Sequence, residues 1–143
     1  MLIVTMLRSK GEFVATVPPT ATVRELLGVL AEHRIGAVVV SADDSIAGIV
    51  SERDVVRRLG DDAAALLDGP VSAIMTADVV TCTPQTAVED LARTMTERRI
   101  RHVPVVDDDG ALVGIVSIGD VVKSRISELE SERDDLVGYI GTR

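Results

Sequence analysis

Two short stretches of the sequence place a hydroxyl three residues ahead of a carboxylate. They are "GIVSERD" (48–54) and "GIVSIGD" (114–120), which carry Ser51 with Asp54 and Ser117 with Asp120. In each, a strand-like apolar run turns into a helix-like pattern, where a serine can cap backbone N–H groups and an aspartate favours the positive end of the helix dipole. A hydroxyl and a carboxylate at a helix start can also accept hydrogen bonds from the vicinal hydroxyls of a ribose. On these residues alone, both interpretations stay open.

The motifs of several other chemistries are missing from the sequence. There is no G-x-G-x-x-G, no P-loop and no G-x-S-x-G, and two histidines with one cysteine give no zinc spacing. The "DDDG" stretch (107–110) lacks the alternating ligands and the terminal glutamate of an EF-hand, so it predicts a polar hairpin turn. We therefore expect no catalytic residues and no catalytic cofactor, and an enzyme acting on nucleotides is the interpretation we favour least.

Composition narrows the possible partners. A net charge of -8 and only two aromatic residues, Phe13 and Tyr139, argue against a phosphate-backbone footprint and a base-stacking platform, so we expect no nucleic-acid partner. The apolar start "MLIVTMLRSKG" is too short to span a bilayer, so we expect no membrane partner and a cytoplasmic location. The single Cys82 fits a reducing compartment.

The chain is a tandem repeat. Residues 14–40 align with 79–105 at a constant offset of 65, which superposes the two prolines, the helix apolar positions and the pair "RI" that ends each helix. After a one-residue insertion, 48–59 aligns with 114–125. We therefore expect a first copy at 7–59, a linker at 60–71, a second copy at 72–125 and a C-terminal helical extension at 126–143.

Each copy shows the same order of elements. Apolar residues at i, i+3, i+4 and i+7 from Val23 and from Val88 predict an amphipathic helix, with capping boxes at Thr22 with Glu25 and at Thr86 with Glu89. Two β-branched runs joined by an Asp-rich turn then predict a hairpin, and a second helix follows. The unit is strand, helix, strand, strand, helix. This predicts an α+β fold in which the two copies pack around a pseudo-twofold axis.

This tandem arrangement resembles a pair of cystathionine β-synthase (CBS) domains, called a Bateman module, over about residues 7–125. The resemblance implies a regulatory module that binds adenine nucleotides in clefts between the copies, with Ser51, Asp54, Ser117 and Asp120 at the ribose. It also implies that two strand starts receive the adenine through backbone and aliphatic side chains. Their residues are Ile35, Gly36, Ala37 and Val38 in the first copy and Ile100, Arg101, His102, Val103 and Pro104 in the second.

Positive charge gathers beside one of these strand starts, in "ERRIRH" (97–102). Arg101 and His102 flank the expected adenine site and can approach a phosphate, although arginines also suit a solvated helix end. The first copy has Gly36 and Ala37 at these positions, so we expect the two clefts to differ. Arg53 adjoins Asp54 at a helix start where backbone N–H groups can hold a phosphate. Lys10 is a weaker phosphate candidate.

The apolar pattern continues from Val122 beyond the second copy at steps of four and three, interrupted by Arg133. It predicts a long terminal helix with a coiled-coil-like seam, which either packs back on the repeats or contributes to a homodimer. The residues are Val122, Ile126, Leu129, Leu136 and Ile140.

We therefore expect a non-enzymatic sensor that signals to a protein effector in trans by conformational change. AMP is the expected ligand, with ATP or NAD(H) as alternatives. A structural or protein-interaction module with vestigial clefts is the alternative function.

Overall fold

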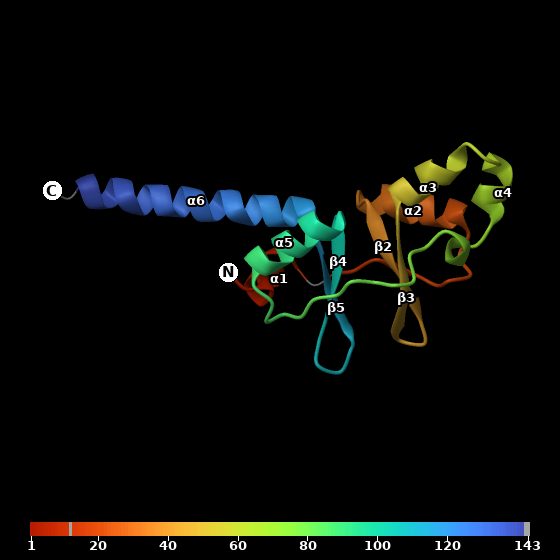
Figure 1. Cartoon of the computed structure of the whole chain (residues 1–143), viewed down its shortest axis with the longest axis horizontal. Coiled ribbons are helices and arrows are strands. Elements are labelled where there is room, and N and C mark those ends of the chain that lie inside the picture. Colours follow the sequence, from red (N-terminus) through yellow and green to blue (C-terminus); the bar gives the residue numbers. More distant parts are fainter. Residues whose placement is uncertain (12, 142–143) are drawn as a thin grey trace.

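A computed structural model describes residues 1–11 and 13–141 of the chain, which form two α+β halves side by side and a long helix that projects from one of them (Figure 1). The first half contains β1 (Thr16–Val17), α2 (Val23–His33), β2 (Ala37–Ala42), β3 (Ser45–Ser51), α3 (Glu52–Leu59), α4 (Ala63–Asp68) and the 3-10 helix η1 (Val71–Ala73). The second contains α1 (Ile3–Lys10), α5 (Val88–Arg98), β4 (His102–Val106), β5 (Leu112–Ser117) and α6 (Ile118–Gly141). The expected α+β class is confirmed.

The sheets follow the repeat, with one difference. In the first half β1 runs parallel to β2, and β2 pairs antiparallel with β3. In the second half β4 and β5 form the matching hairpin, but the expected opening strand is reduced to one parallel bridge between Cys82 and Val105 among the described residues. The Asp-rich turn of the first hairpin is confirmed, since Asp43 and Asp44 both have positive φ, as a two-residue hairpin turn requires.

The helix starts confirm one predicted cap and correct another. Thr22 Oγ1 accepts from the N–H of Glu25 at 3.0 Å, so α2 begins as expected. The prediction that Thr86 caps α5 is wrong, because the N-cap is Ala87. Ala87 is the residue that aligns with Thr22 at the offset of 65. Thr86 lies one residue earlier, and its hydroxyl accepts from the N–H of Thr83 at 3.1 Å.

Each half has its own apolar core. Each core is completed by a segment that crosses from the other part of the chain. Ile3, Met6 and Leu7, at or before the expected start of the first copy, are buried in the core of the second. Val71 and Ile74, on either side of the expected start of the second copy, are buried in the core of the first. The expected bounds of 7–59 and 72–125 stay a prediction, because the segments near both boundaries pack into the core of the other copy.

A glycine in each hairpin makes room for the crossing segment. A Cβ on Gly48 would lie 2.7 Å from Met75 Sδ and 2.8 Å from the backbone oxygen of Thr76. A Cβ on Gly114 would lie 2.7 Å from Leu7 Cδ2, which is the end of a flexible side chain. The two sites are therefore equivalent in position, but the contact at Gly48 is the stiffer one.

Helix α6 is a single helix of 24 residues, which at the usual rise is about 36 Å long. It begins at Ile118, directly after β5, and extends away from both halves (Figure 1). The seam predicted for it lies at the surface, so the alternative in which it packs back on the repeats is wrong. Its exposed members are Val122, Ile126, Leu129, Leu136 and Ile140, with 48% to 68% of their surface accessible.

Candidate functional site

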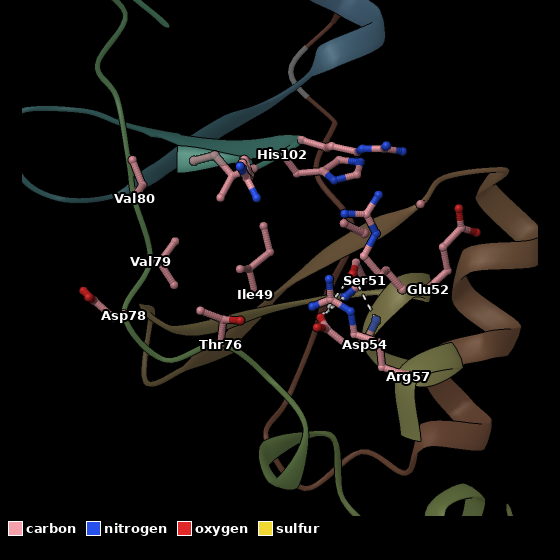
Figure 2. Close-up of a pocket in the computed structure, with 16 residues that line it drawn as sticks. Ile49, Ser51, Glu52, Asp54, Arg57, Thr76, Asp78, Val79, Val80 and His102 are labelled. Atoms are coloured by element: carbon pink, nitrogen blue, oxygen red, sulfur yellow. Dashed lines mark hydrogen bonds between the residues drawn. The ribbon is translucent and has the colours of Figure 1, made fainter. Parts of the chain in front are cut away.

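A cleft of about 250 Å³ lies between the two copies, and both contribute to its lining (Figure 2). The first copy supplies the start of β2, the end of β3 and the first turns of α3. The second copy supplies residues 99–102, between α5 and β4. The segment that leaves the first core towards the second copy forms a further wall. The lining residues are Gly36, Ala37, Ile49, Ser51, Glu52, Arg53, Asp54, Arg57, Thr76, Asp78, Val79, Val80, Arg99, Ile100, Arg101 and His102.

Ser51 and Asp54 form a complete capping box at the start of α3 while they line this cleft (Figure 2). Asp54 N–H donates to Ser51 Oγ at 3.3 Å, and Ser51 N–H donates to Asp54 Oδ2 at 2.8 Å. Ser51 Oγ–H also donates to Asp54 Oδ2, at 3.1 Å. Among the described residues, the hydrogen bonds accepted by this carboxylate all go to Oδ2. A carboxylate offers about four lone-pair positions on two oxygens, so the cap leaves acceptor capacity for a ligand hydroxyl.

Four arginines face the cleft from its two sides. Arg53 and Arg57 are four residues apart on α3, a spacing that places them on one face of the helix. Arg99 and Arg101 come from the second copy, where Arg99 ends α5 in the left-handed conformation (φ 55°). All four side chains are exposed, so their charge is available to an anion that enters the cleft.

His102 lies in the wall of the cleft near acidic and basic groups. Burial lowers the pKa of its imidazole most, and the charges of Lys10 and Arg101 lower it further, while Glu52 and Asp120 oppose them. The imidazole is therefore neutral near pH 7 and has one donor and one acceptor nitrogen. Gly36 lies between His102 and Glu52, since a Cβ at Gly36 would be 3.4 Å from Glu52 Oε1 and 3.6 Å from the His102 ring.

The second Ser-x-x-Asp pair has the same cap geometry but different surroundings. Ser117 N–H donates to Asp120 Oδ2 at 2.8 Å, and Asp120 N–H donates to Ser117 Oγ at 3.1 Å. Lys10 Nζ donates to the same Oδ2 at 2.5 Å and to the backbone oxygen of Ile115 at 2.6 Å. Burial alone would raise the pKa of Asp120, but the hydrogen bonds from Lys10 and Ser117 and the lysine charge lower it overall.

Of the fifteen residues expected at the nucleotide sites, eight line the cleft: Ser51, Arg53, Asp54, Gly36, Ala37, Ile100, Arg101 and His102. The others lie elsewhere. Val38 and Val103 have no accessible surface and belong to the two cores, and Pro104 is buried. The remaining ones outside the lining are Ile35, Ser117, Asp120 and Lys10.

Half of the residues that line the cleft were not among those expected from the sequence. Arg57 could have been predicted, because it lies four residues after Arg53 and therefore on the same helix face. Arg99 could have been predicted too, because it lies in the basic stretch 97–102. The wall formed by Thr76, Asp78, Val79 and Val80 could not, because its position depends on the crossing of the inter-repeat segment. An adjoining hollow of about 370 Å³ shares Arg53, Arg99, Ile100 and Arg101 with the cleft and adds Met95, Thr96 and Ile118.

Residues 1–11 and 13–141 contain no group of three or more His, Cys, Asp or Glu side chains placed to hold a metal ion. Within the same described part of the chain, no helix is long and apolar enough to cross a membrane.

Two α+β copies that share a cleft, each with a Ser-x-x-Asp pair at a helix start, define a class of tandem-repeat modules. A family model described as the CBS domain matches residues 11–61 and 71–127. The chain therefore belongs to the CBS domain family, and the resemblance stated from the sequence is confirmed.

Solved structures of this family share the fold over most of the chain. A CBS-domain containing protein from Agrobacterium tumefaciens is 44% identical with a TM-score of 0.84, and the match covers 87% of this chain and 99% of that one. A CBS domain protein from Pyrobaculum aerophilum, complexed with AMP, is 35% identical with a TM-score of 0.74, over 84% and 89% of the two chains.

Among curated relatives, a mitochondrial CBS domain-containing protein of Arabidopsis thaliana is 37% identical over 124 residues. The match covers 83% of this chain and 60% of the relative, so the chain spans less than two thirds of that protein's length.

Proposed function

We propose that this chain is a regulatory module that binds an adenine nucleotide in the cleft at Ser51 and Asp54. The observation that carries the proposal is the convergence, in one cleft, of a Ser-x-x-Asp pair and four arginines from both copies. The structure of the Pyrobaculum relative with AMP, at 35% identity, supports the ligand class.

The cleft offers a partner for each part of a nucleotide. Asp54 accepts hydrogen bonds from the ribose hydroxyls through the carboxylate lone pairs that the helix cap does not use. The aliphatic side chains that cover the faces of the base are those of Ile49, Val79, Val80 and Ile100. The phosphate lies among the arginines, where charge-assisted hydrogen bonds are the strongest available. AMP is the expected nucleotide. ATP and NAD(H) are the alternatives, since the groups that they carry beyond AMP have room in the adjoining hollow, which shares Arg53, Arg99 and Arg101 with the cleft.

The module acts without catalysis. The nucleotide touches both copies, so it favours one arrangement of the copies over another by its differential affinity for the two, and a protein effector in trans reads the change. We place the module in the cytoplasm. A protein-interaction module with vestigial clefts is the competing function, because the Ser51–Asp54 cap is complete without any ligand.

The same proposal includes a homodimer formed through α6, because the exposed apolar seam of this helix follows a heptad pattern that is interrupted only at Arg133. In an antiparallel pair of α6 helices from two protomers, Ile126 of one protomer faces Leu129 of the other. This register places Arg125 of one protomer opposite Glu132 of the other, and Lys123 opposite Glu130. Sedimentation velocity tests this arrangement.

Leu129→Arg is expected to give monomers. Arg125→Glu is expected to weaken the dimer and Arg125→Glu/Glu132→Arg to restore it. Rescue by Arg125→Glu/Glu130→Arg instead would show a parallel pair, and a monomeric unmodified chain would refute the dimer.

Thermal unfolding of the ligand-stripped protein with AMP, ADP, ATP, NAD⁺ and NADH in turn tests the nucleotide. A ligand at a hundred times its Kd stabilises the folded state by about 2.7 kcal/mol, which a melting curve resolves. A shift with one nucleotide supports the sensor and identifies its ligand. If no nucleotide shifts the midpoint, the cleft is vestigial and the interaction module is the better function.

A further inference from the structure

The two copies present the same Ser-x-x-Asp cap, yet only the one in the first copy lines the cleft described above. Asp54 faces the cleft with acceptor capacity to spare. Asp120, its counterpart, already accepts from the ammonium group of Lys10 through Oδ2. The two side chains of this ion pair keep 29% and 21% of their surface accessible, so the pair is partly withdrawn from solvent.

Lys10 replaces a backbone donor that the first copy uses. In the first copy the oxygen of Ile49 accepts from the N–H of Thr76 at 2.9 Å, within the crossing segment. In the second copy the aligned oxygen of Ile115 accepts from Lys10 Nζ at 2.6 Å instead. The lysine therefore joins the edge of β5 to the carboxylate at the start of α6, and it does so from α1, whose apolar face is fixed in the second core.

We infer that Lys10 closes the Asp120 site to nucleotide, so that the chain binds one nucleotide, at Asp54. The inference rests on the proposed function. A ribose hydroxyl that bonds Oδ2 of Asp120 would have to displace the ammonium group, which exchanges a bond between two full charges for a bond between one charge and a neutral hydroxyl. The displaced ammonium would also lose its bond to Ile115.

The residues aligned with the arginines of the open cleft do not offset that loss. Arg53 aligns with Gly119, and Arg101 aligns with Gly36, so two of the four guanidinium groups have no counterpart in the other copy. Arg57 and Arg99 align with Lys123 and Arg34. A phosphate at the Asp120 site would therefore meet fewer cations, and binding there gains less to set against the displacement of Lys10.

Isothermal titration with AMP, and separately with ATP, tests the stoichiometry. The unmodified chain is expected to bind one nucleotide, and Lys10→Gln is expected to bind two, with the added site weaker because of Gly119 and Gly36. Arg8→Gln is the matched control, since it removes a positive charge from the same helix, and it is expected to bind one. Far-UV circular dichroism checks that each variant is folded. Lys10→Ala is a second variant that removes the ammonium group from the Asp120 site.

A pair of Asp54 variants separates the two sites. Asp54→Ala is expected to lose most of its binding, and Lys10→Gln/Asp54→Ala to retain the weaker site alone. Two sites in the unmodified chain, or one site in both Lys10 variants, overturns the inference while the proposed function stands. No binding by any of the proteins overturns the proposed function, and the inference with it.

Discussion

The sharpest test of the site compares Asp54→Ala with Asp120→Ala, because the chain supplies its own control. Both aspartates hold the same position in a helix cap, so alanine removes a hydrogen bond from a serine N–H in each case. Loss of this hydrogen bond costs about 1 kcal/mol while the serine cap stays, and Asp120→Ala also breaks a partly exposed ion pair worth at most about 1 kcal/mol. Both ligand-free variants should therefore melt a few degrees below the unmodified chain.

Nucleotide stabilisation should separate them. At a hundred times Kd, AMP adds about 2.7 kcal/mol, or roughly 8 °C at about 3 °C per kcal/mol for a chain of this size. The hydrogen bonds of a charged carboxylate to the ribose are worth about 1.5 to 3 kcal/mol, so Asp54→Ala should raise Kd roughly tenfold to a hundredfold. At the same AMP concentration the stabilisation then falls to about 0.4 to 1.4 kcal/mol, or roughly 1 to 4 °C.

Differential scanning fluorimetry at fixed AMP concentration measures both shifts against each variant's own ligand-free midpoint. Asp120→Ala should keep the full shift of roughly 8 °C, because the closed site contributes nothing to it. Equal loss of the shift in the two variants would refute the assignment of the ligand to Asp54. An undiminished shift in Asp54→Ala would refute any contact between that carboxylate and the ribose.

In urea unfolding, Gly48→Ala should destabilise the chain by about 1 to 3 kcal/mol and by more than Gly114→Ala, because its new Cβ meets a backbone oxygen and not only a side-chain end; equal costs would contradict this. Desolvation raises the pKa of the buried Cys82 thiol to about 11, so at pH 8 about one thiol in a thousand is ionised. Thiol reagents should therefore label Cys82 no faster than the chain unfolds, and prompt labelling of the native protein would refute this. The pKa of the Asp120 carboxyl is lower in the folded protein than in the unfolded chain. The carboxylate therefore contributes stability that is complete above its pKa in the unfolded chain and is lost as pH falls through its pKa in the folded protein. The stability difference between the unmodified chain and Lys10→Gln should therefore shrink below about pH 4, and a difference independent of pH would contradict the ion pair.

The repeat made most of the fold predictable from the sequence. An offset of 65 transfers each element of one copy to the other, so the amphipathic helices, the hairpins and the helix starts at Ser51 and Ser117 agree with the structure. The error at Thr86 arose because a neighbouring threonine matched the capping pattern while the aligned residue is Ala87, which has no side chain to cap with.

The missed features depend on contacts between parts of the chain that local patterns do not connect. Helix α1 has an apolar face, but nothing in its sequence says that it completes the core of the distant second copy. The bond from Lys10 to Asp120 spans 110 positions and follows from that packing. The wall of the cleft at Val79 and Val80 likewise depends on where the inter-repeat segment runs.

The structure also ties the cleft to the helix that projects from it. The N–H of Ile118, the first residue of α6, donates to the backbone oxygen of Arg101 at 2.8 Å, and the side chain of Arg101 lines the cleft. In the proposed function, a phosphate that drew the Arg101 side chain towards α3 of the first copy would pull on the backbone to which the base of α6 is bonded. Because α6 is a continuous rod of about 36 Å, a tilt of about 5° at its base displaces its far end by about 3 Å. We propose that a single nucleotide held between the copies moves the apolar seam assigned to the homodimer by this route, without a second nucleotide.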